Sequence, residues 1–353
     1  MEMAPSPSQP PSPPSLLGET LSAKNSCDVR FKESSQATAI LRALASAQRI
    51  VVTSHSNPDP DAYASSVALA YGLRKLGKQT LCVNRSGLVR DLAYLPLVSE
   101  VKTHSFMEKP DLLVVTDCSS LSGIGRDIAE INPEGAPVLN LDHHYLSNSM
   151  YGAHNLVSHE VSCSSELAYV ILRDLGAPVD ADLATLLLAG IYNDTVSLQK
   201  LITSPETFQV VKELFSLGGN LERFVDPMYR NTPAEVIKFK GKLLSRIEPQ
   251  CEGRYLPIVV DLSKMAARGI SERDLFSLKN LPLEVAGVVI GAFIRVDGDT
   301  CRVSLRSKGD VDARALAGHF GGHGHKNAAG FTFHGSVKAL LSELASKVTA
   351  ALH

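Results

Sequence analysis

Between residues 36 and 200, short and uniformly apolar runs alternate with longer segments in which apolar residues recur at helical spacing. The apolar runs predict buried parallel strands, because strands covered on both faces lack a polar alternation. The predicted strands are RIVVTSH (49–55), QTLCVN (79–84), DLLVVTD (111–117) and PVLNLDHH (137–144), and the predicted helices cover 37–48, 61–76, a segment after 122, 164–175 and 181–193. This alternation indicates an α/β fold whose parallel sheet has helices on both faces.

A second α/β pattern follows a polar helical segment over 201–250, which we expect to link two domains. Its predicted strands cover 255–262, 284–296, 300–307 and 330–333, and its predicted helices cover 271–278, 312–320 and the chain end from 337. A length of 353 residues agrees with two domains, because one hydrophobic core seldom extends over so long a chain. We therefore expect a larger domain over 36–200 and a smaller α/β domain over 251–353.

Residues 1–35 are rich in Pro and Ser and show no hydrophobic periodicity, so we expect a disordered tail. The tail lacks the basic and apolar regions of a signal peptide and has too little Arg to favour a transit peptide. Six widely spaced cysteines argue against a disulfide scaffold or a zinc ribbon, and they suit a reducing compartment. No apolar run approaches the roughly 20 residues that span a bilayer. We expect a cytoplasmic protein without membrane contact.

The chain carries 35 basic and 37 acidic side chains, which gives a formal net charge of -2. Proteins that bind long duplex DNA usually show a basic excess, because much of their affinity comes from neutralising phosphates. The balance therefore argues against long duplex DNA and favours small or short phosphorylated substrates, held by a few placed cations. The sequence leaves the assembly open, with a homodimer as one option.

The candidate chemistry lies at the predicted strand ends. His55, Asp117 and Asp142 each stand at or just past the carboxyl end of a strand, the edge where open α/β sheets bind ligands. The first strand leads into HSNPDPDA, in which Asp59 and Asp61 flank a proline that stiffens the loop. If these two acids stood alone, an Asn-Pro-Asp turn and a helix cap would account for them equally well.

The other acids and histidines favour a functional role over a turn and a helix cap. Asp142 is followed by His143 and His144, for which only an exposed loop offers a structural explanation. Asp117 taken alone is more simply a turn cap, whereas Asp194 ends an apolar helix, where the helix dipole slightly disfavours a carboxylate. Together these side chains supply enough oxygen and nitrogen ligands for two divalent ions. Such a set suits Mn²⁺ better than an ion that prefers thiolates.

Four motifs, HSNPDPDA, VVTDCSS, LDHH and GIYNDT, resemble in order and spacing the signature motifs of the DHH phosphoesterase superfamily. In the second domain, SLRS and GGHGHKNAAG resemble the DHHA1 domain, with His325 on the family's histidine. Over about residues 36–340 the chain is similar to the nano-RNase and pAp phosphatase group (bifunctional oligoribonucleases and PAP phosphatases). The resemblance implies a DHH domain, a smaller DHHA1 domain and a cleft between them.

The resemblance also implies hydrolysis of short oligoribonucleotides to mononucleotides and of 3′-phosphoadenosine 5′-phosphate (pAp) to AMP, with two divalent ions, expected to be Mn²⁺. The implied ligands are His55, Asp59 and Asp117 for one ion, and Asp61, Asp117, His143 and Asp194 for the other. Asp142 would orient the imidazoles, and His144 would act near the scissile phosphate. The implied substrate-binding residues are Arg306, Gly321, Gly322, His323, Gly324 and His325.

The substrate segment also has a simpler explanation, a tight turn with exposed histidines. Favouring substrate binding, Arg306 offers a forked donor set that matches phosphate, and the glycines permit unusual φ values and close approach of a ligand. Three positions depart from the family pattern: Ala64 and Val196 stand where glycines are usual, and His323 interrupts the glycine run. None of these departures removes a metal ligand, but His323 bears on the substrate loop.

Two other functions stay open at this point. The same ligands would serve a cyclic di-AMP or pApA phosphodiesterase, and a chain that had lost turnover would be a non-catalytic nucleotide- or metal-binding module. Retention of every expected ligand favours an enzyme. A RecJ-like exonuclease fits less well, because the chain is too short for extra domains and has no basic excess. A manganese pyrophosphatase would lack the GGHGH loop.

Overall fold

The computed structural model describes residues 35–352 except 90–91, 104, 106, 126, 145–149 and 200–202. The tail predicted over 1–35 lies, but for its last residue, outside the described residues. The chain divides into two compact units between Pro227 and Met228, inside the segment predicted as a helical link. Among the described residues, no helix is both long enough and apolar enough to cross a membrane.

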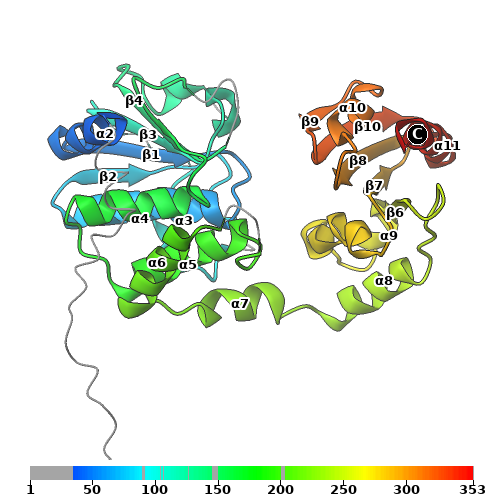
Figure 1. Ribbon diagram of the computed structural model, residues 1–353. Coiled ribbons are helices and arrows are strands. Elements are labelled where there is room, and N and C mark those ends of the chain that lie inside the picture. Colours follow the sequence, from blue (N-terminus) through cyan, green and yellow to red (C-terminus); the bar gives the residue numbers. More distant parts are fainter. Residues whose placement is uncertain are drawn as a thin grey trace, which may run out of the picture. The chain divides into compact units, whose positions relative to one another are not determined.

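The first unit is built on a parallel sheet in the order β2-β1-β3-β4-β5 (Figure 1). Its strands are β1 (Arg49–Ser54), β2 (Gln79–Cys82), β3 (Leu112–Thr116), β4 (Val138–Asp142) and β5 (His154–Val157). In register, Ser54 lies opposite Thr116 and Thr116 lies opposite Leu141, so the carboxyl ends of β1, β3 and β4 come together at one edge. The predicted parallel α/β fold is confirmed, and β5 is a strand that the sequence pattern did not predict.

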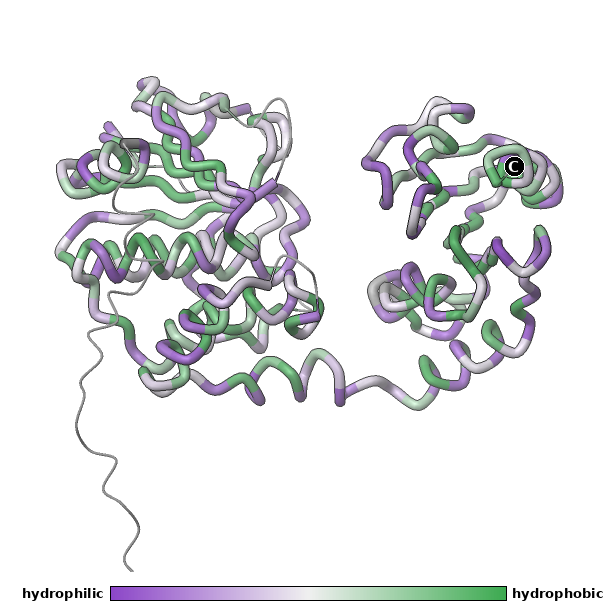
Figure 2. The backbone as a smooth tube through the Cα atoms, viewed as in Figure 1, coloured by the Kyte–Doolittle hydropathy of each residue, from purple (hydrophilic) through white to green (hydrophobic). Residues whose placement is uncertain are grey.

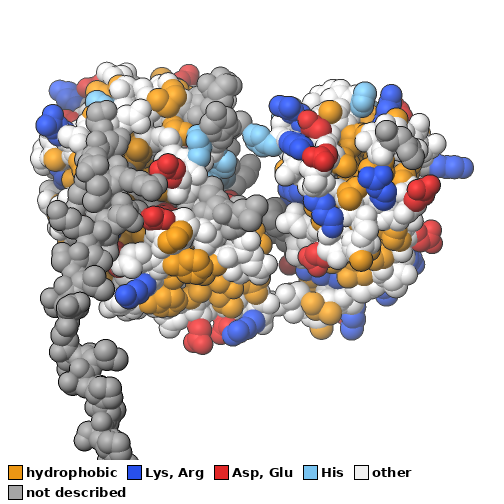
Figure 3. All heavy atoms as spheres, viewed as in Figure 1, with side chains coloured by type: hydrophobic (Ala, Val, Ile, Leu, Met, Phe, Trp, Pro, Cys, Tyr) orange, Lys and Arg blue, Asp and Glu red, His pale blue; other side chains and the backbone are white. Residues whose placement is uncertain are grey.

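The strands at the middle of this sheet are hydrophobic along most of their length (Figure 2) and almost fully buried, as expected for a sheet covered on both faces. The helices of the unit are α2 (Ser35–Ser46), α3 (Pro60–Lys75), α4 (Ser164–Asp174), α5 (Ala181–Asp194) and α6 (Pro205–Ser216). Helix α3 contacts β1, β2 and β3, and α4 contacts β4. Hydrophobic side chains gather on the surface over α5 and α6 (Figure 3), where α6 exposes Phe208 and Phe215.

The helix predicted after residue 122 is instead a pair of short 3-10 helices, Leu121–Ile124 and Ile128–Glu130. Gly125 ends the first of them with a φ of +73°, a conformation that an α-helix cannot continue. Ile124 from this segment packs against Val51 and the other buried residues of one sheet face. A further 3-10 helix covers Val98–Glu100.

Three helices pack very closely beside the strand ends. A Cβ added at Gly190 of α5 would lie 2.0 Å from Ser165 Oγ in α4 and 2.9 Å from Ala64 Cβ in α3. Only glycine leaves room for this approach. The small side chain of Ala64 also keeps the contact possible, so the departure from the family's glycine fits the packing. The amino ends of α3 and α4 are thereby brought together.

The second unit contains a mixed sheet in the order β6-β7-β8-β10-β9, in which β6 and β7 are parallel and the other neighbours are antiparallel. The strands are β6 (Tyr255–Asp261), β7 (Ile290–Asp297), β8 (Thr300–Ser307), β9 (His323–His325) and β10 (Ala328–His334). The helices are α8 (Ala234–Leu244), α9 (Leu262–Ala266), α10 (Ala313–Gly318) and α11 (Val337–Leu352), while α7 (Glu222–Tyr229) spans the boundary between the units.

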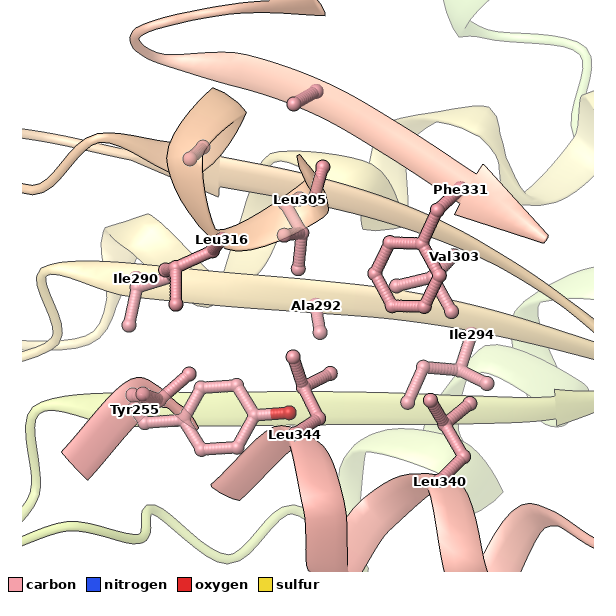
Figure 4. Packing of buried hydrophobic residues seen from close by; sticks show 14 of the residues in the cluster. Tyr255, Ile290, Ala292, Ile294, Val303, Leu305, Leu316, Phe331, Leu340 and Leu344 are labelled. Carbon is pink, nitrogen blue, oxygen red and sulfur yellow. The ribbon is translucent and has the colours of Figure 1, made fainter. Parts of the chain in front are cut away.

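One core cluster of this unit lies between the sheet and α11, and a second one includes Phe239 of α8 and Phe293 of β7. Leu340 and Leu344 of α11 face Tyr255, Ile294 and Val303 of the strands (Figure 4). Three features differ from the sequence expectation. The segment predicted as a helix over 271–278 is the 3-10 helix Arg273–Lys279, β7 begins after a second 3-10 helix, Leu281–Glu284, and part of the glycine-rich loop forms β9.

Candidate metal centre

The first motif places its residues at the join between β1 and α3. His55 follows β1 directly, and Asp59 is the N-cap of α3, with its Oδ1 accepting hydrogen bonds from the backbone N–H groups of Asp61 and Ala62 at 2.9 and 3.0 Å. Pro60 occupies the first turn, where its missing N–H costs nothing. The helix cap that the sequence allowed is therefore real, and the second carboxylate oxygen of Asp59 remains for another partner.

Asp117 lies at the centre of the predicted residues. Its Oδ2 is 3.6 Å from His55 Nε2, and its Oδ1 is 3.4 Å from His143 Nε2 and 3.7 Å from His144 Nδ1. The residue is 3% exposed and adopts a φ of +53°, a left-handed conformation that few residues other than glycine adopt. Backbone strain of this kind concentrates at functional sites.

Two groups of three potential ligand atoms share Asp117, and within each group the atoms lie within 4.8 Å of one another. One group contains His55, Asp59 and Asp117, and the other contains Asp117, His143 and His144. The first is the ligand set implied for one ion. In the second, His144 appears where Asp61 and Asp194 were expected, although Asp194 Oδ2 lies 3.8 Å from His143 Nε2.

Asp61 binds the start of helix α4. Both of its carboxylate oxygens accept backbone N–H groups at the start of α4, from Ser164 to Oδ2 and from Ser165 to Oδ1, each at 2.9 Å. The side chain is 1% exposed. Each carboxylate oxygen can accept a second partner, so these bonds leave capacity for a cation.

Asp142 ends β4 and is completely buried. Its Oδ1 accepts hydrogen bonds from the backbone N–H groups of His143 and His144 at 2.8 and 3.2 Å, and it lies 2.8 Å from His144 Nδ1. A proton on Nδ1 leaves Nε2 of the same ring available for another partner. The contact to a ring is thus with His144, whereas His143 is held by Asp142 only through its backbone.

The electrostatics of the cluster depend on Asp117. Burial lowers the pKa of His55 and His143, but the hydrogen bond with Asp117 and the other polar neighbours together outweigh burial and raise the pKa of each to about 9. Burial opposes ionisation of Asp117 too, yet the two imidazoles hold its pKa well below the usual range. Burial raises the pKa of Asp61 to about 7, with repulsion from Asp117 as the second cause, and burial raises that of Asp59. Bound cations would relieve this crowding of carboxylates.

The predicted substrate residues of the second unit lie on three neighbouring strands. Arg306 in β8 pairs with Ala328 in β10, which pairs with His325 in β9, so these residues share one face of the sheet. His323, two residues before His325, has the same orientation, and both histidines are exposed. Arg306 donates from Nε to Asn280 Oδ1 at 3.2 Å.

The glycines of this segment have a structural explanation. A Cβ at Gly322 would lie 2.3 Å from the carbonyl oxygen of Gly330, and a Cβ at Gly324 would lie 2.5 Å from that of Ala328. Gly321 and Gly324 also have positive φ values of 72° and 146°. Glycine is therefore required at these positions because strand β10 packs closely against them.

Sequence reasoning missed Ser164. Its hydroxyl donates to Asp117 Oδ1 at 3.0 Å, and its backbone N–H donates to Asp61. The only local signal is the run SCSSE, in which serines precede a predicted helix with Glu166 in its first turn. That pattern predicts a helix start, and it gives no hint of contacts with acids far away in the sequence.

Comparisons with known proteins agree with the motifs. The model of the DHH family, N-terminal domain, matches residues 49–191, and that of the DHHA1 domain matches residues 260–351. The chain is 30% identical over 287 residues to the bifunctional oligoribonuclease and PAP phosphatase NrnA of Thermus thermophilus, covering 81% of this chain and 84% of the relative. It is 24% identical over 300 residues to the protein of the same name from Bacillus subtilis, covering 84% and 93%.

A solved structure shares the fold. The chain matches an exopolyphosphatase-related protein from Bacteroides fragilis with a TM-score of 0.81 and 22% identity, covering 90% of this chain and 97% of that one. The likeness extends over both units, because the alignment includes almost all the described residues. At 22% identity, this likeness shows a shared fold alone.

Proposed function

The chain belongs to the DHH family of phosphoesterases, and from that premise we propose that it hydrolyses short oligoribonucleotides to mononucleotides and pAp to AMP. Two ligand groups that share the buried Asp117 carry this proposal. The relatives named oligoribonuclease and PAP phosphatase match most of this chain, so the same two units are available for the same substrates.

The donor set fits two divalent cations. It consists of carboxylate oxygens and imidazole nitrogens without a thiolate, which favours Mn²⁺ over ions that prefer sulfur. We propose His55, Asp59 and Asp117 as ligands of one ion, and Asp61, Asp117, His143 and Asp194 as ligands of the other. Bound cations would supply charge stabilisation at the phosphoryl oxygens and a lower pKa for the attacking water.

His144 and Asp142 would act beside these ligands. Asp142 Oδ1 lies 2.8 Å from His144 Nδ1, which favours a proton on that nitrogen and leaves Nε2 for the substrate. The pKa of His144 is raised: burial alone would lower it, but the hydrogen bond with Asp142 and the negative charges of Asp117 and Asp142 together outweigh burial. We propose that His144 donates a hydrogen bond or a proton to the phosphate or to the departing oxygen.

The second unit would bind the nucleotide. We propose that Arg306, His323 and His325 contact substrate phosphate or base, because they point to the same side of the sheet and offer cationic or polar donors. Gly321, Gly322 and Gly324 belong to the same proposed substrate segment. A few such donors suit a small substrate, in agreement with a net charge of -2.

Cyclic di-AMP or pApA hydrolysis is the enzymatic alternative, and the names of the relatives favour pAp and oligoribonucleotides over it. We also propose a cytoplasmic location. Five cysteines of the described part are free thiols, which suits a reducing compartment.

Product analysis tests the proposal. Purified protein with Mn²⁺ is offered pAp, pApA, cyclic di-AMP, di- to pentaribonucleotides and a long single strand, and the products are separated by chromatography. We expect mononucleotides from the short RNAs and AMP from pAp, with slower attack on the long strand and on cyclic di-AMP. Asp142→Ala serves as the impaired control. Equal silence of both proteins towards every substrate would contradict the proposed activity.

A further inference from the structure

Helix α4 begins without a cap from its own neighbourhood. Cys163 stands at the N-cap position and makes no capping hydrogen bond with its side chain. The first N–H groups of a helix have no partner inside the helix and need one elsewhere. Asp61, at the start of another helix, supplies both oxygens to the N–H groups of Ser164 and Ser165.

Ser164 makes a second contact with the candidate metal centre. Its hydroxyl donates to Asp117 Oδ1 at 3.0 Å, while its N–H donates to Asp61 Oδ2 at 2.9 Å. The residue is 1% exposed. One buried serine thus binds an acid of the first motif and also the acid that both ligand groups share.

The turn that carries Ser164 is itself held firmly. Glu166 Oε2 accepts from the N–H of Ser162 at 3.0 Å, from the hydroxyl of Ser162 at 2.6 Å and from the hydroxyl of Thr207 at 2.9 Å. On another side, Gly190 lies so close to Ser165 that no side chain would fit there. These contacts fix the start of α4, so Ser164 can act as a rigid support.

We propose that Ser164 is a positioning residue of the metal centre, which holds Asp61 and Asp117 in their binding orientation before a cation arrives. This inference rests on the proposed function, because it takes both carboxylates as cation ligands. Carboxylates crowded in a buried site repel one another, and N–H and O–H dipoles directed at them offset that repulsion. A ligand set already in place loses less conformational freedom when the ion binds.

The chain offers a matched pair of variants. Ser164→Ala removes the hydroxyl that reaches Asp117 and keeps the backbone N–H. Ser165→Ala removes an equally buried hydroxyl of the same turn, whose bonds within the described structure go only to the Asp61 backbone carbonyl, at 3.5 Å. Both changes delete one buried oxygen, and the unfolding midpoint of each variant is measured beside its Mn²⁺ affinity.

Mn²⁺ binding to the metal-free protein, measured by calorimetry without substrate, distinguishes the two variants. We expect Ser164→Ala to bind Mn²⁺ about tenfold more weakly, the effect of losing one hydrogen bond to a charged group. Ser165→Ala should bind as wild type does. Turnover of Ser164→Ala should recover at high Mn²⁺ concentration, because bound cations then hold Asp117 themselves.

Three results would overturn the inference. If Ser164→Ala bound Mn²⁺ as tightly as wild type, the Ser164 hydroxyl would have no role in positioning the ligands. If both variants lost the same Mn²⁺ affinity, the loss would be due to packing. If wild type binds no Mn²⁺ at all, the inference fails together with the metal centre. In contrast, normal Mn²⁺ binding by Ser164→Ala with normal turnover of pAp by wild type would remove this inference and leave the proposed function intact.

A second measurement needs no variant and covers the case in which Ser164→Ala does not fold. Hydrogen exchange of wild-type protein should show the amides of Ser164 and Ser165 protected without metal, because Asp61 already binds them. Exchange at the rate of open amides in metal-free protein, with protection only after Mn²⁺ is added, would contradict a support that exists before the cation.

Discussion

The candidate metal centre of the first unit and the proposed substrate face of the second unit are built in opposite ways. Residues of the metal centre come from widely separated segments, are largely buried, and lie within a few ångströms of one another. Arg306, His323 and His325 lie on neighbouring strands and remain accessible. Groups that must share a cation need a fold that forces charges together, whereas groups that receive a substrate need only register and exposure.

Backbone strain follows the same division. In the candidate metal centre Asp117 adopts a positive φ of 53°, and Val196, two residues after Asp194, adopts a φ of 51°, although neither is glycine. In the substrate segment the positive φ values fall on Gly321 and Gly324. Strain carried by residues that chemistry requires is typical of reaction centres, whereas a binding turn can use glycine at no steric cost.

The largest expected effect comes from removing the residue that both ligand groups share. Asp117→Ala should lower kcat for pAp by about a thousandfold or more, because it takes a ligand from both ions. Calorimetry should show loss of Mn²⁺ binding. Asp111→Ala is the control. Asp111 stands just before β3, at the opposite end of the strand from Asp117, and accepts hydrogen bonds from the N–H groups of Gln48 and Arg49. A loss of turnover below tenfold in Asp117→Ala would contradict a shared ligand.

A smaller and different effect is expected on the substrate face. Arg306→Ala should raise KM for pAp about tenfold to a hundredfold through loss of charge-assisted hydrogen bonds, while Mn²⁺ affinity stays unchanged. Arg302→Ala provides the control, because Arg302 is on the same strand but lies 3.6 Å from Glu272. If Arg306→Ala changed Mn²⁺ affinity and left KM alone, the division of labour between the two regions would be wrong.

The pH dependence of metal binding should distinguish the regions further. In metal-free protein His55 and His143 have pKa values of about 9, so protons compete with Mn²⁺ below that pH. Apparent affinity measured by calorimetry should rise at least about tenfold for each pH unit from about pH 7 to pH 8.5. The raised pKa values also stabilise the metal-free fold below about pH 6.5, and this stability is lost as pH rises through about 9. A flat affinity over this range would show that neither imidazole binds the ion.

The smallest effect concerns strain beside Asp194. Val196→Gly should raise the free energy of unfolding by about 0.5–1 kcal/mol, because glycine adopts a φ of 51° without the cost that a β-branched residue bears. Urea denaturation measures the change, with Val196→Ala as the control that keeps a Cβ. Equal stabilities for wild type and Val196→Gly would mean that no strain is stored at this position.

Much of the fold could be predicted because its strands are apolar and its helices are periodic. The strand β5 could not, since His154–Val157 is short and half polar, and its partner β4 lies outside any local window. The glycine-rich segment was expected as a loop, and pairing with β10 turns part of it into β9. Pairing partners of this kind are a property of the tertiary fold.

The candidate site divides in the same way. The positions of His55, Asp117 and His143 at predicted strand ends were enough to predict that these side chains lie close together, because parallel strands end at one edge of the sheet. The orientation of Asp61 depends on Ser164 and Ser165, more than a hundred positions away in the sequence. The sequence pattern around Asp61 predicts only a loop and a helix start, so it cannot tell which backbone amides the carboxylate will meet.

A titration of Mn²⁺ into metal-free wild-type protein, with AMP release from pAp followed at each step, tests the central claim most directly. If two cations share Asp117, calorimetry should count two Mn²⁺ per chain, and AMP should appear only as these sites fill. Release of AMP at full rate from chelator-treated protein, or a titration that shows no bound Mn²⁺ while AMP is formed, would contradict a metal-dependent phosphoesterase built on this cluster.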